Sequence, residues 1–139
     1  MVDMEVPKVD MVRGLVVDDE ELVHQAMARL VAATEGFVLV GSAATGDESL
    51  VVAATARPDL VLMDINLLGI DGPEATRRLQ AFHPRPIVLL ISTYGEGDAD
   101  YLACGAAGYI SKVAFGQGRL LEVWSAATGL GLDESTAKP

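Results

Sequence analysis

Short apolar runs in this sequence end, one after another, in side chains that can do chemistry. The run at 12–17 is followed by two adjacent carboxylates, and the run that begins at Leu60 ends in a third. Later runs end in hydroxyls and in a lysine; the residues concerned are Asp18, Asp19, Asp64, Ser92, Thr93 and Lys112. Aspartate is a recognised nucleophile toward phosphorus, and hydroxyl and ammonium groups suit phosphate oxygens. This set therefore indicates phosphoryl transfer to an aspartate.

Three carboxylates in one crevice require a counter-charge. Like charges at short range raise one another's pKa, so Asp18, Asp19 and Asp64 would resist ionising together. A hard divalent cation removes this repulsion, and Mg2+ prefers oxygen ligands in an octahedron at about 2.0 to 2.1 Å. We therefore expect these carboxylates to form a magnesium site.

The elements that must position these residues alternate in type along the chain. Continuous apolar runs are typical of buried strands, whereas apolar residues at helical spacing predict helices covered on one face. Strands are predicted at 12–17, 37–40, 60–63, 87–91 and 109–110, and helices from Glu20, over 47–56, from Pro73, and over 97–104 and 120–128. Gly41 should end the second strand. Arg57 should end the second helix, because a residue before proline avoids the α region.

Five strands alternating with five helices predict a doubly wound α/β fold, flavodoxin-like, with a five-stranded parallel sheet. With the strand order 2-1-3-4-5, the first and third strands are neighbours, and Asp18, Asp19 and Asp64 meet at their carboxyl ends. Ligands in such folds bind beyond these ends, where the strand order reverses. We expect the functional site at this edge of the sheet.

Composition limits the classes of function. The chain has 139 residues, half of them hydrophobic and 22% charged, which predicts a single folded domain. Its 20 acidic and 10 basic residues give a net charge of -10, which disfavours nucleic-acid binding by the chain itself. No uncharged apolar stretch reaches the roughly 18 residues of a membrane span and no secretory signal is visible, so we expect a cytoplasmic protein without membrane contact. The single Cys104 suits a reducing compartment.

Four motifs make the sequence resemble the receiver domain of two-component response regulators. They are LVVDDEE at 15–21, PDLVLMDINLLGIDG at 58–72, PIVLLIST at 86–93 and GAAGYISK at 105–112. The stretch GFVLVGSAATGDESL is most similar to the NarL/LuxR-type subfamily, whose receivers carry a helix-turn-helix output domain. The resemblance implies a receiver domain at 12–128, between an N-terminal extension, 1–11, and a C-terminal tail, 129–139.

The resemblance implies a role for the acids at the strand ends. Asp64 would be the phosphoacceptor. Mg2+ would be held by Asp18, Asp19, Asp64 and the backbone carbonyl of Asn66.

The resemblance also implies how phosphorylation changes the domain. Lys112 would bind the phosphate, and Ser92 would be the switching hydroxyl, with Thr93 as the alternative. Tyr109 would be the switch aromatic that follows this hydroxyl.

As a receiver, the chain would take a phosphoryl group from a sensor histidine kinase and catalyse only its own phosphorylation and dephosphorylation. Its change of conformation would control an output domain or a partner and would thereby regulate transcription. The implied homodimer surface is the fourth helix, fifth strand and fifth helix. DNA contact would occur only through an output domain, for which this chain has no room.

Three features depart from the family pattern. Leu68 stands where the family usually has proline, and Val113 replaces the common proline after Lys112. Ser92 and Lys112 are only 20 positions apart, which predicts a shortened fourth helix.

Two other functions stay open. One is a pure interaction module that no longer takes phosphate, which the complete acid, hydroxyl and lysine set disfavours. The other is a haloacid-dehalogenase-type phosphatase, which needs a second acid where Asn66 stands. We interpret His24 and His83 as ordinary surface residues, because phosphohistidine carriers are helical bundles.

Overall fold

The computed structural model describes residues 11–92 and 103–129, which contain all five predicted strands. In chain order the elements are β1 (Val12–Val17), α1 (Glu21–Ala33), β2 (Phe37–Ala43), α2 (Gly46–Ala56), β3 (Leu60–Asp64), α3 (Gly72–Leu79), β4 (Ile87–Ser92), β5 (Gly108–Ser111), the 3-10 turn η3 (Lys112–Ala114) and α5 (Gln117–Thr128). The helix predicted over 97–104 lies almost entirely outside the described residues. None of the helices described in these ranges is long and apolar enough to cross a membrane.

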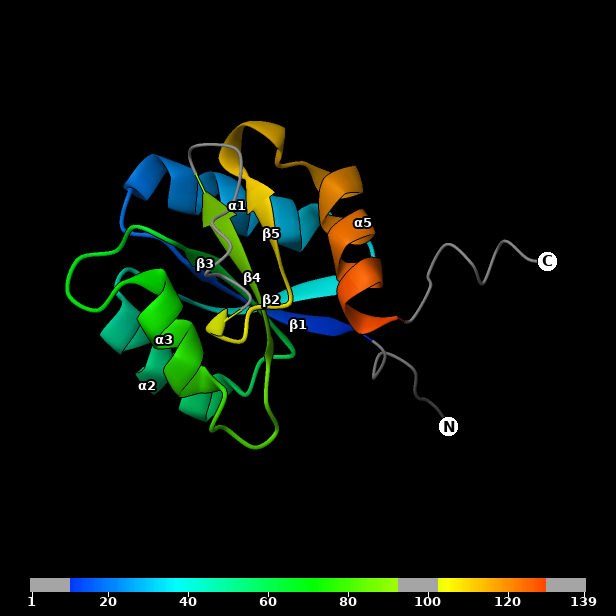
Figure 1. The fold of residues 1–139 in the computed structure, drawn as a ribbon. Helices are drawn as coiled ribbons and strands as arrows, with labels where there is room; N and C mark the ends of the chain where they lie inside the picture. The colour runs from blue at the N-terminus through cyan, green and yellow to red at the C-terminus, as the bar shows by residue number, and fades with distance from the viewer. Residues whose placement is uncertain (1–10, 93–102, 130–139) are drawn as a thin grey trace, which may run out of the picture.

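The strands form one parallel sheet in the order β2-β1-β3-β4-β5, as predicted. Figure 1 shows α1 and α5 on one face of this sheet and α2 and α3 on the other. Helices on both faces exclude water from both sides of the central strands, and every residue of β3 is buried. This explains why the strand sequences are continuously apolar instead of alternating with polar residues.

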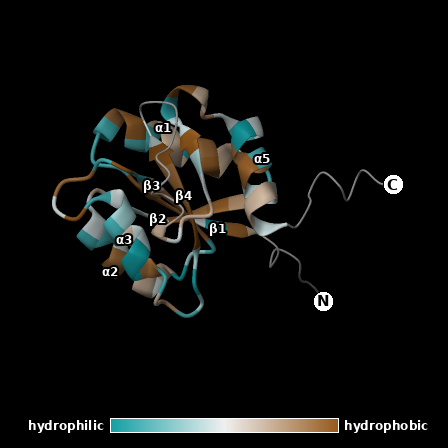
Figure 2. Cartoon of the chain, in the orientation of Figure 1, coloured by the Kyte–Doolittle hydropathy of each residue, from teal (hydrophilic) through white to brown (hydrophobic). Residues whose placement is uncertain are grey.

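Each face of the sheet has its own apolar layer. The layer toward α2 and α3 includes Leu15, Val61, Met63, Leu79, Leu90 and Cys104. The layer toward α1 and α5 includes Val16, Met27, Leu62, Leu89, Ile110 and Trp124. Figure 2 shows the strands between these layers as the most hydrophobic part of the chain. The rings of Trp124 and Phe37 meet edge to face with centroids 6.1 Å apart, which fastens α5 to the start of β2.

The ends of α2 and α3 follow local signals in the sequence. Thr45 and Asp71 each accept the backbone N–H of the residue three positions on, at 3.0 and 2.9 Å, and so cap the two helices. The α2 helix ends at Ala56, and Arg57 adopts a left-handed φ of 51° directly before Pro58. The helix end predicted at this proline is therefore confirmed.

The second strand is longer than predicted. Gly41 does not end β2, and pairing with β1 continues as far as Ala43. A Cβ atom at Gly41 would lie 2.9 Å from Cγ1 of Val52, so this glycine allows α2 to approach the strand closely. The predicted strand end at Gly41 was wrong, because this glycine lies inside β2, where it is needed for the close packing of α2.

Candidate functional site

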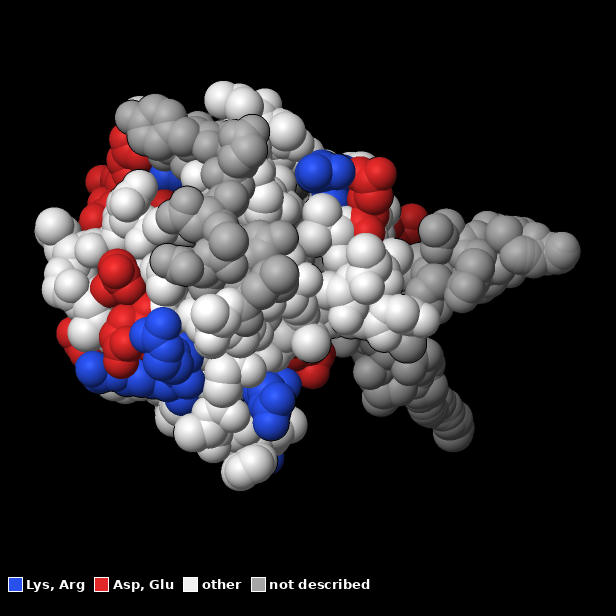
Figure 3. All heavy atoms as spheres, viewed as in Figure 1, with Lys and Arg blue, Asp and Glu red and all other residues white. Residues whose placement is uncertain are grey.

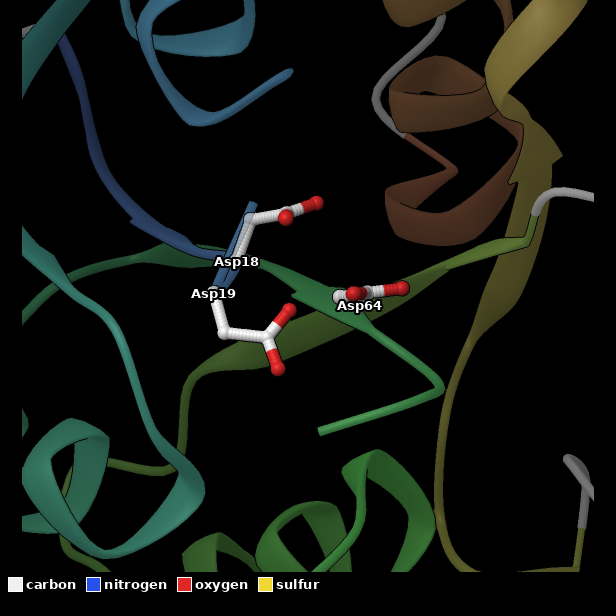
Figure 4. Close-up of side chains that lie close together, drawn as sticks. All are labelled: Asp18, Asp19 and Asp64. Carbon is white, nitrogen blue, oxygen red and sulfur yellow. The ribbon is translucent and has the colours of Figure 1, made fainter. Parts of the chain in front are cut away.

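Three carboxylates meet at the carboxyl ends of two paired strands. Asp18 and Asp19 follow β1, and Asp64 is the last residue of β3. Carboxylate oxygens of all three lie within 4.8 Å of one another, and Figure 4 shows them projecting from neighbouring strand ends. Asp18 and Asp64 are 1% and 2% exposed, whereas Asp19 is open to solvent. The structure thus brings together the three acids that the sequence places at these strand ends.

Hydrogen bonds hold Asp18 at its backbone and at one carboxylate oxygen. Its N–H donates to the carbonyl of Ala43 at 3.1 Å, and its Oδ1 accepts the N–H of Glu20 at 2.8 Å. Its backbone carbonyl lies 2.8 Å from Nδ1 of His24. The remaining oxygen, Oδ2, is buried and accepts no hydrogen bond. One oxygen of Asp18 is therefore desolvated, and the positive charge nearest to it comes from the ammonium of Lys112, 3.3 Å away.

Lys112 brings the balancing positive charge to these acids. Its Nζ lies 3.3 Å from Oδ2 of Asp18, 3.4 Å from Oδ1 of Asp64 and 3.8 Å from Oε1 of Glu20. Burial alone would lower the pKa of Lys112, but the carboxylates of Asp64 and Asp18 outweigh it and raise the pKa above its usual value. Lys112 is therefore a permanent cation at the end of β5.

The carboxyl group of Asp64 is less acidic than an ordinary aspartate. Burial, and then the charge of Asp18, raise the pKa of Asp64 from 3.8 to about 6. The charge of Lys112 and the N–H of Asn66, which lies 3.4 Å from Oδ1, act in the opposite direction. Asp64 is therefore mostly ionised at neutral pH and is a stronger base than a free carboxylate, which suits a nucleophile.

The loop after Asp64 is held close to the strand end by a glycine. A Cβ atom at Gly72 would overlap the carbonyl oxygen of Asp64 and lie 2.8 Å from Cα of Ile65. The N–H of Gly72 donates to the carbonyl of Ile65 at 2.9 Å, which closes the loop at its base. Leu68, in place of the usual proline, projects into solvent with 73% of its surface exposed. The substitution at Leu68 therefore leaves the closure of the loop in place.

Ser92 and Tyr109 lie on the same face of neighbouring strands. Ser92 ends β4 and is 9% exposed. The register pairs Leu90 with Tyr109 and Ser92 with Ser111, and side chains two positions apart on a strand share a face. Both residues therefore face the layer of α2 and α3, where Tyr109 packs against the core. The alternative hydroxyl, Thr93, lies outside the described residues.

The donor set fits a hard divalent cation. All three candidate ligands are carboxylates, which suit magnesium and calcium better than soft metals. Three acids face one lysine, and the buried Oδ2 of Asp18 is paired with the Nζ atom of that lysine at 3.3 Å without a well-aligned hydrogen bond. A cation here would relieve both the charge imbalance and the desolvation of that oxygen.

The sequence analysis missed one contact of this site. His24, interpreted as an ordinary surface residue, is half-buried and binds the backbone of Asp18. Its place in the first turn of α1 was the available signal, since a side chain there can reach back over the helix start. His83 is exposed, as expected.

Some of the charges away from the site form ion pairs on the helix surfaces. Arg77 and Arg78 both bind Glu74, and Arg119 binds Glu122. Figure 3 shows basic and acidic side chains side by side on the face that it draws. On this face the basic groups are interspersed with acidic ones.

Comparison with known proteins identifies related sequences. The family model of the response regulator receiver domain matches residues 15–124. The response regulator GacA of Pseudomonas viridiflava is 43% identical over 106 residues, which cover 75% of this chain and 50% of that protein. The response regulator UvrY of Escherichia coli K12 is 37% identical over 106 residues, which cover 75% of this chain and 49% of that protein. The chain thus spans about half the length of the curated relatives it matches.

A solved structure supports the same relationship. The signal receiver domain of the response regulator NarL from Mycobacterium tuberculosis superposes with a TM-score of 0.78 and 28% sequence identity. The match covers 86% of this chain and 98% of the NarL domain. The sheet order and flanking helices of the present chain are therefore those of a signal receiver domain.

Proposed function

The chain belongs to the response regulator receiver domain family, and from this premise we propose that Asp64 is the residue that accepts the phosphoryl group. Members of the family are phosphoacceptors in two-component signalling. The observation that carries the assignment is the position of Lys112 Nζ, which lies 3.3 Å from Asp18 and 3.4 Å from Asp64. This arrangement offers a nucleophile, a phosphate-binding cation and a cluster of acids at one strand edge.

The proposed reaction is a phosphoryl transfer to a carboxylate. An oxygen of ionised Asp64 forms a bond to phosphorus while the bond from phosphorus to the donor nitrogen breaks. The leaving imidazole keeps the electron pair of that bond and takes a proton from water. Attack of water on the phosphorus of the aspartyl phosphate later releases inorganic phosphate and restores Asp64.

The acids around Asp64 would hold Mg2+. We assign the ligands to the carboxylates of Asp18, Asp19 and Asp64 and to the backbone carbonyl of Asn66, and the clustering of the three acids supports this set. When bound, Mg2+ supplies positive charge that offsets the charge on the phosphoryl oxygens. Asp18 contributes a buried oxygen, Oδ2, whose partner in the protein is the ammonium of Lys112.

Lys112 and Ser92 would recognise the transferred group. Lys112 is a compact point charge that can follow a phosphate oxygen away from Asp64. Ser92 ends the strand next to β3 and would donate its hydroxyl to another phosphate oxygen. Tyr109 lies on the same face as Ser92 and would move with it.

The partners of the whole protein follow from the family and its relatives. A sensor histidine kinase is the proposed donor of the phosphoryl group, and the proposed activity is cytoplasmic. The matches to GacA and UvrY favour a transcription regulator of the NarL/LuxR type, in which an output domain contacts DNA. We propose that 12–128 form the receiver domain and that it associates with itself through β5, α5 and the segment predicted as the fourth helix.

Mass spectrometry of the intact protein tests the central assignment. Incubation with acetyl phosphate and Mg2+ should add one phosphoryl group to the parent and none to Asp64→Asn. The matched control is Asp47→Asn, which removes an exposed carboxylate from the first turn of α2 and should be phosphorylated like the parent.

Two results would contradict the proposal. Phosphorylation that persists in Asp64→Asn would place the acceptor elsewhere. A parent that takes up no phosphoryl group, although Mg2+ binds, would favour an interaction module that has lost phosphate chemistry.

A further inference from the structure

We propose that His24 is a positioning residue for the magnesium site, because its imidazole fixes the peptide unit that joins Asp18 to Asp19. The inference rests on the proposed function, since these two acids are the assigned ligands of Mg2+. It concerns a half-buried side chain that no step of the proposed phosphoryl transfer uses.

The geometry determines which atom of His24 carries the proton. Its Nδ1 lies 2.8 Å from the backbone carbonyl oxygen of Asp18. A carbonyl oxygen only accepts hydrogen bonds, so Nδ1 must be the donor. The imidazole therefore donates to the Asp18 carbonyl whether the ring is neutral or charged.

This carbonyl belongs to the peptide bond between two metal ligands. A peptide unit is planar, so fixing its oxygen fixes the directions in which the chain leaves toward Asp18 and toward Asp19. The contact from His24 therefore restrains both carboxylates at once, although it touches neither of them.

Besides the ion pair of its Oδ2 with Lys112, Asp18 makes three hydrogen bonds within the described residues, and the one to its backbone carbonyl comes from the side chain of His24. The other two partners are the backbone carbonyl of Ala43 and the backbone N–H of Glu20. Substitution leaves those backbone groups in place, whereas it removes the imidazole. Substitution of His24 therefore removes the side-chain support of the Asp18 backbone and leaves the ion pair between the Asp18 carboxylate and Lys112 in place.

The same contact ties the site to the first turn of α1. Glu20, the N-cap residue of α1, makes no side-chain capping bond, and the carboxylate of Asp18 binds its N–H instead. His24 returns from the first turn of the helix to the carbonyl of the same aspartate. The helix start and Asp18 are therefore closed into one hydrogen-bonded unit, which leaves Oδ2 of Asp18 turned toward Lys112.

Loss of this support should weaken cation binding more than folding. Removing an outer-shell partner of a metal ligand typically lowers metal affinity by about 10- to 100-fold. Because His24 acts through the backbone, we expect His24→Ala to raise the Mg2+ concentration for half-saturation by about tenfold. At saturating Mg2+ the rate of Asp64 phosphorylation should return close to that of the parent.

The test is a Mg2+ titration followed by backbone amide NMR shifts of the residues around Asp64, with Mg2+-free melting curves recorded beside it. His24→Asn should recover most of the parent's affinity, since its amide N–H2 can donate from the position of Nδ1. The control is Gln25→Ala, because Gln25 lies next to His24 on α1 and donates a hydrogen bond to the exposed Glu21, away from the acids of the site. Its affinity should match that of the parent.

Three outcomes would overturn the inference: unchanged affinity in His24→Ala, an equal loss in Gln25→Ala, or no recovery in His24→Asn. A parent that binds no Mg2+ would overturn the proposed magnesium site itself, and this inference with it. A parent that binds Mg2+ but is not phosphorylated would contradict only the proposed function, and the titration would still decide the role of His24.

Discussion

The Nζ atom of Lys112 lies 3.4 Å from Oδ1 of Asp64, although the strands that end at these residues are separated in the sheet by β4. The lysine side chain therefore extends across the end of β4 to reach the acid. Its stem lines a cleft together with Ile91 of β4, and only 14% of the side chain is exposed. The side chain of Lys112 thus connects the carboxyl ends of β1, β3 and β5, so a change at any of these ends should alter its position.

Lys112→Gln should remove both the proposed phosphate-binding cation and a positive charge that lowers the pKa of Asp64. Phosphorylation by acetyl phosphate at saturating Mg2+ should fall by about a hundredfold, as on loss of one electrostatic stabiliser in other enzymes. The pKa of Asp64 should rise further above 6, because the lysine charge now lowers it. A pH titration of the Asp64 carboxyl carbon by NMR measures this rise.

The control for this substitution is Arg119→Gln, which removes a cation from an exposed pair with Glu122. Its phosphorylation and the pKa of Asp64 should remain at the parent's values. If Lys112→Gln is phosphorylated at the parent's rate, Lys112 is not the phosphate-binding group.

Asp64→Asn should stabilise the Mg2+-free protein at neutral pH. The folded-state pKa of Asp64 is about 6, above the 3.8 of the unfolded chain, so folding favours the protonated acid. The contribution of Asp64 to stability is therefore fully present below about pH 4 and is lost as pH rises through about 6. We expect the variant to exceed the parent by about 1 to 3 kcal/mol near pH 7. The gap should close toward pH 4.

Urea unfolding across this pH range in the presence of EDTA measures the gap between parent and variant. Asp47→Asn is the control, because it removes a carboxylate that is exposed to solvent instead of a buried one. A constant gap in Asp64→Asn would mean that burial does not raise the pKa of Asp64.

The fold and the clustered acids could be predicted from sequence because both follow from strand ends. Parallel strands buried on both faces must be apolar throughout, so the first polar residue after each run marks the edge where ligands bind. Asp18 and Asp64 are such residues, and the switch in strand order makes them neighbours. The positions of both residues could therefore be predicted without knowing any side-chain conformation.

Contacts that depend on side-chain direction could not be predicted in this way. The bond from His24 to Asp18 requires a particular rotamer in the first turn of α1. Gly41 was misleading, because a glycine can mark either the end of a strand or a place where another element packs closely against it. Here the side chain of Val52 packs against Gly41. Residue type alone does not separate these two cases.

Gly72→Ala should destabilise the protein and disturb the site together. The added Cβ would overlap the carbonyl oxygen of Asp64, and backbone atoms cannot yield as a flexible side chain can. We expect a loss of about 3 kcal/mol in the free energy of unfolding, as for severe overpacking. Gly118→Ala is the control, since a Cβ there would meet no described atom within 4 Å apart from its own turn of helix, and it should gain about 0.5 kcal/mol. Equal effects of the two substitutions in urea unfolding would show that the approach of Gly72 to Asp64 is not tight.

Phosphorylation should shift the position of Ser92 and, through it, Tyr109. An aspartyl phosphate adds about one further negative charge and new acceptor oxygens at the strand edge. The hydroxyl of Ser92 can reach them only by moving toward Asp64, and Tyr109 shares its face of the sheet on the next strand. Movement of this pair should alter the surface of β5 and α5, where we propose that the domain meets a partner.

Backbone NMR with and without beryllofluoride, a mimic of the aspartyl phosphate, tests this coupling. In the parent, shift changes should extend from Asp64 to Tyr109 and onto α5, with an amplitude set by the difference in affinity for the two conformations. In Ser92→Ala the shift changes should stay near Asp64, because residue 92 no longer has a hydroxyl that can donate to the phosphate. Thr93→Ala is the control and should behave as the parent does. If the shift changes stay near Asp64 in Thr93→Ala but not in Ser92→Ala, Thr93 is the switching hydroxyl instead. If the shift changes reach α5 in both variants, neither hydroxyl drives the switch.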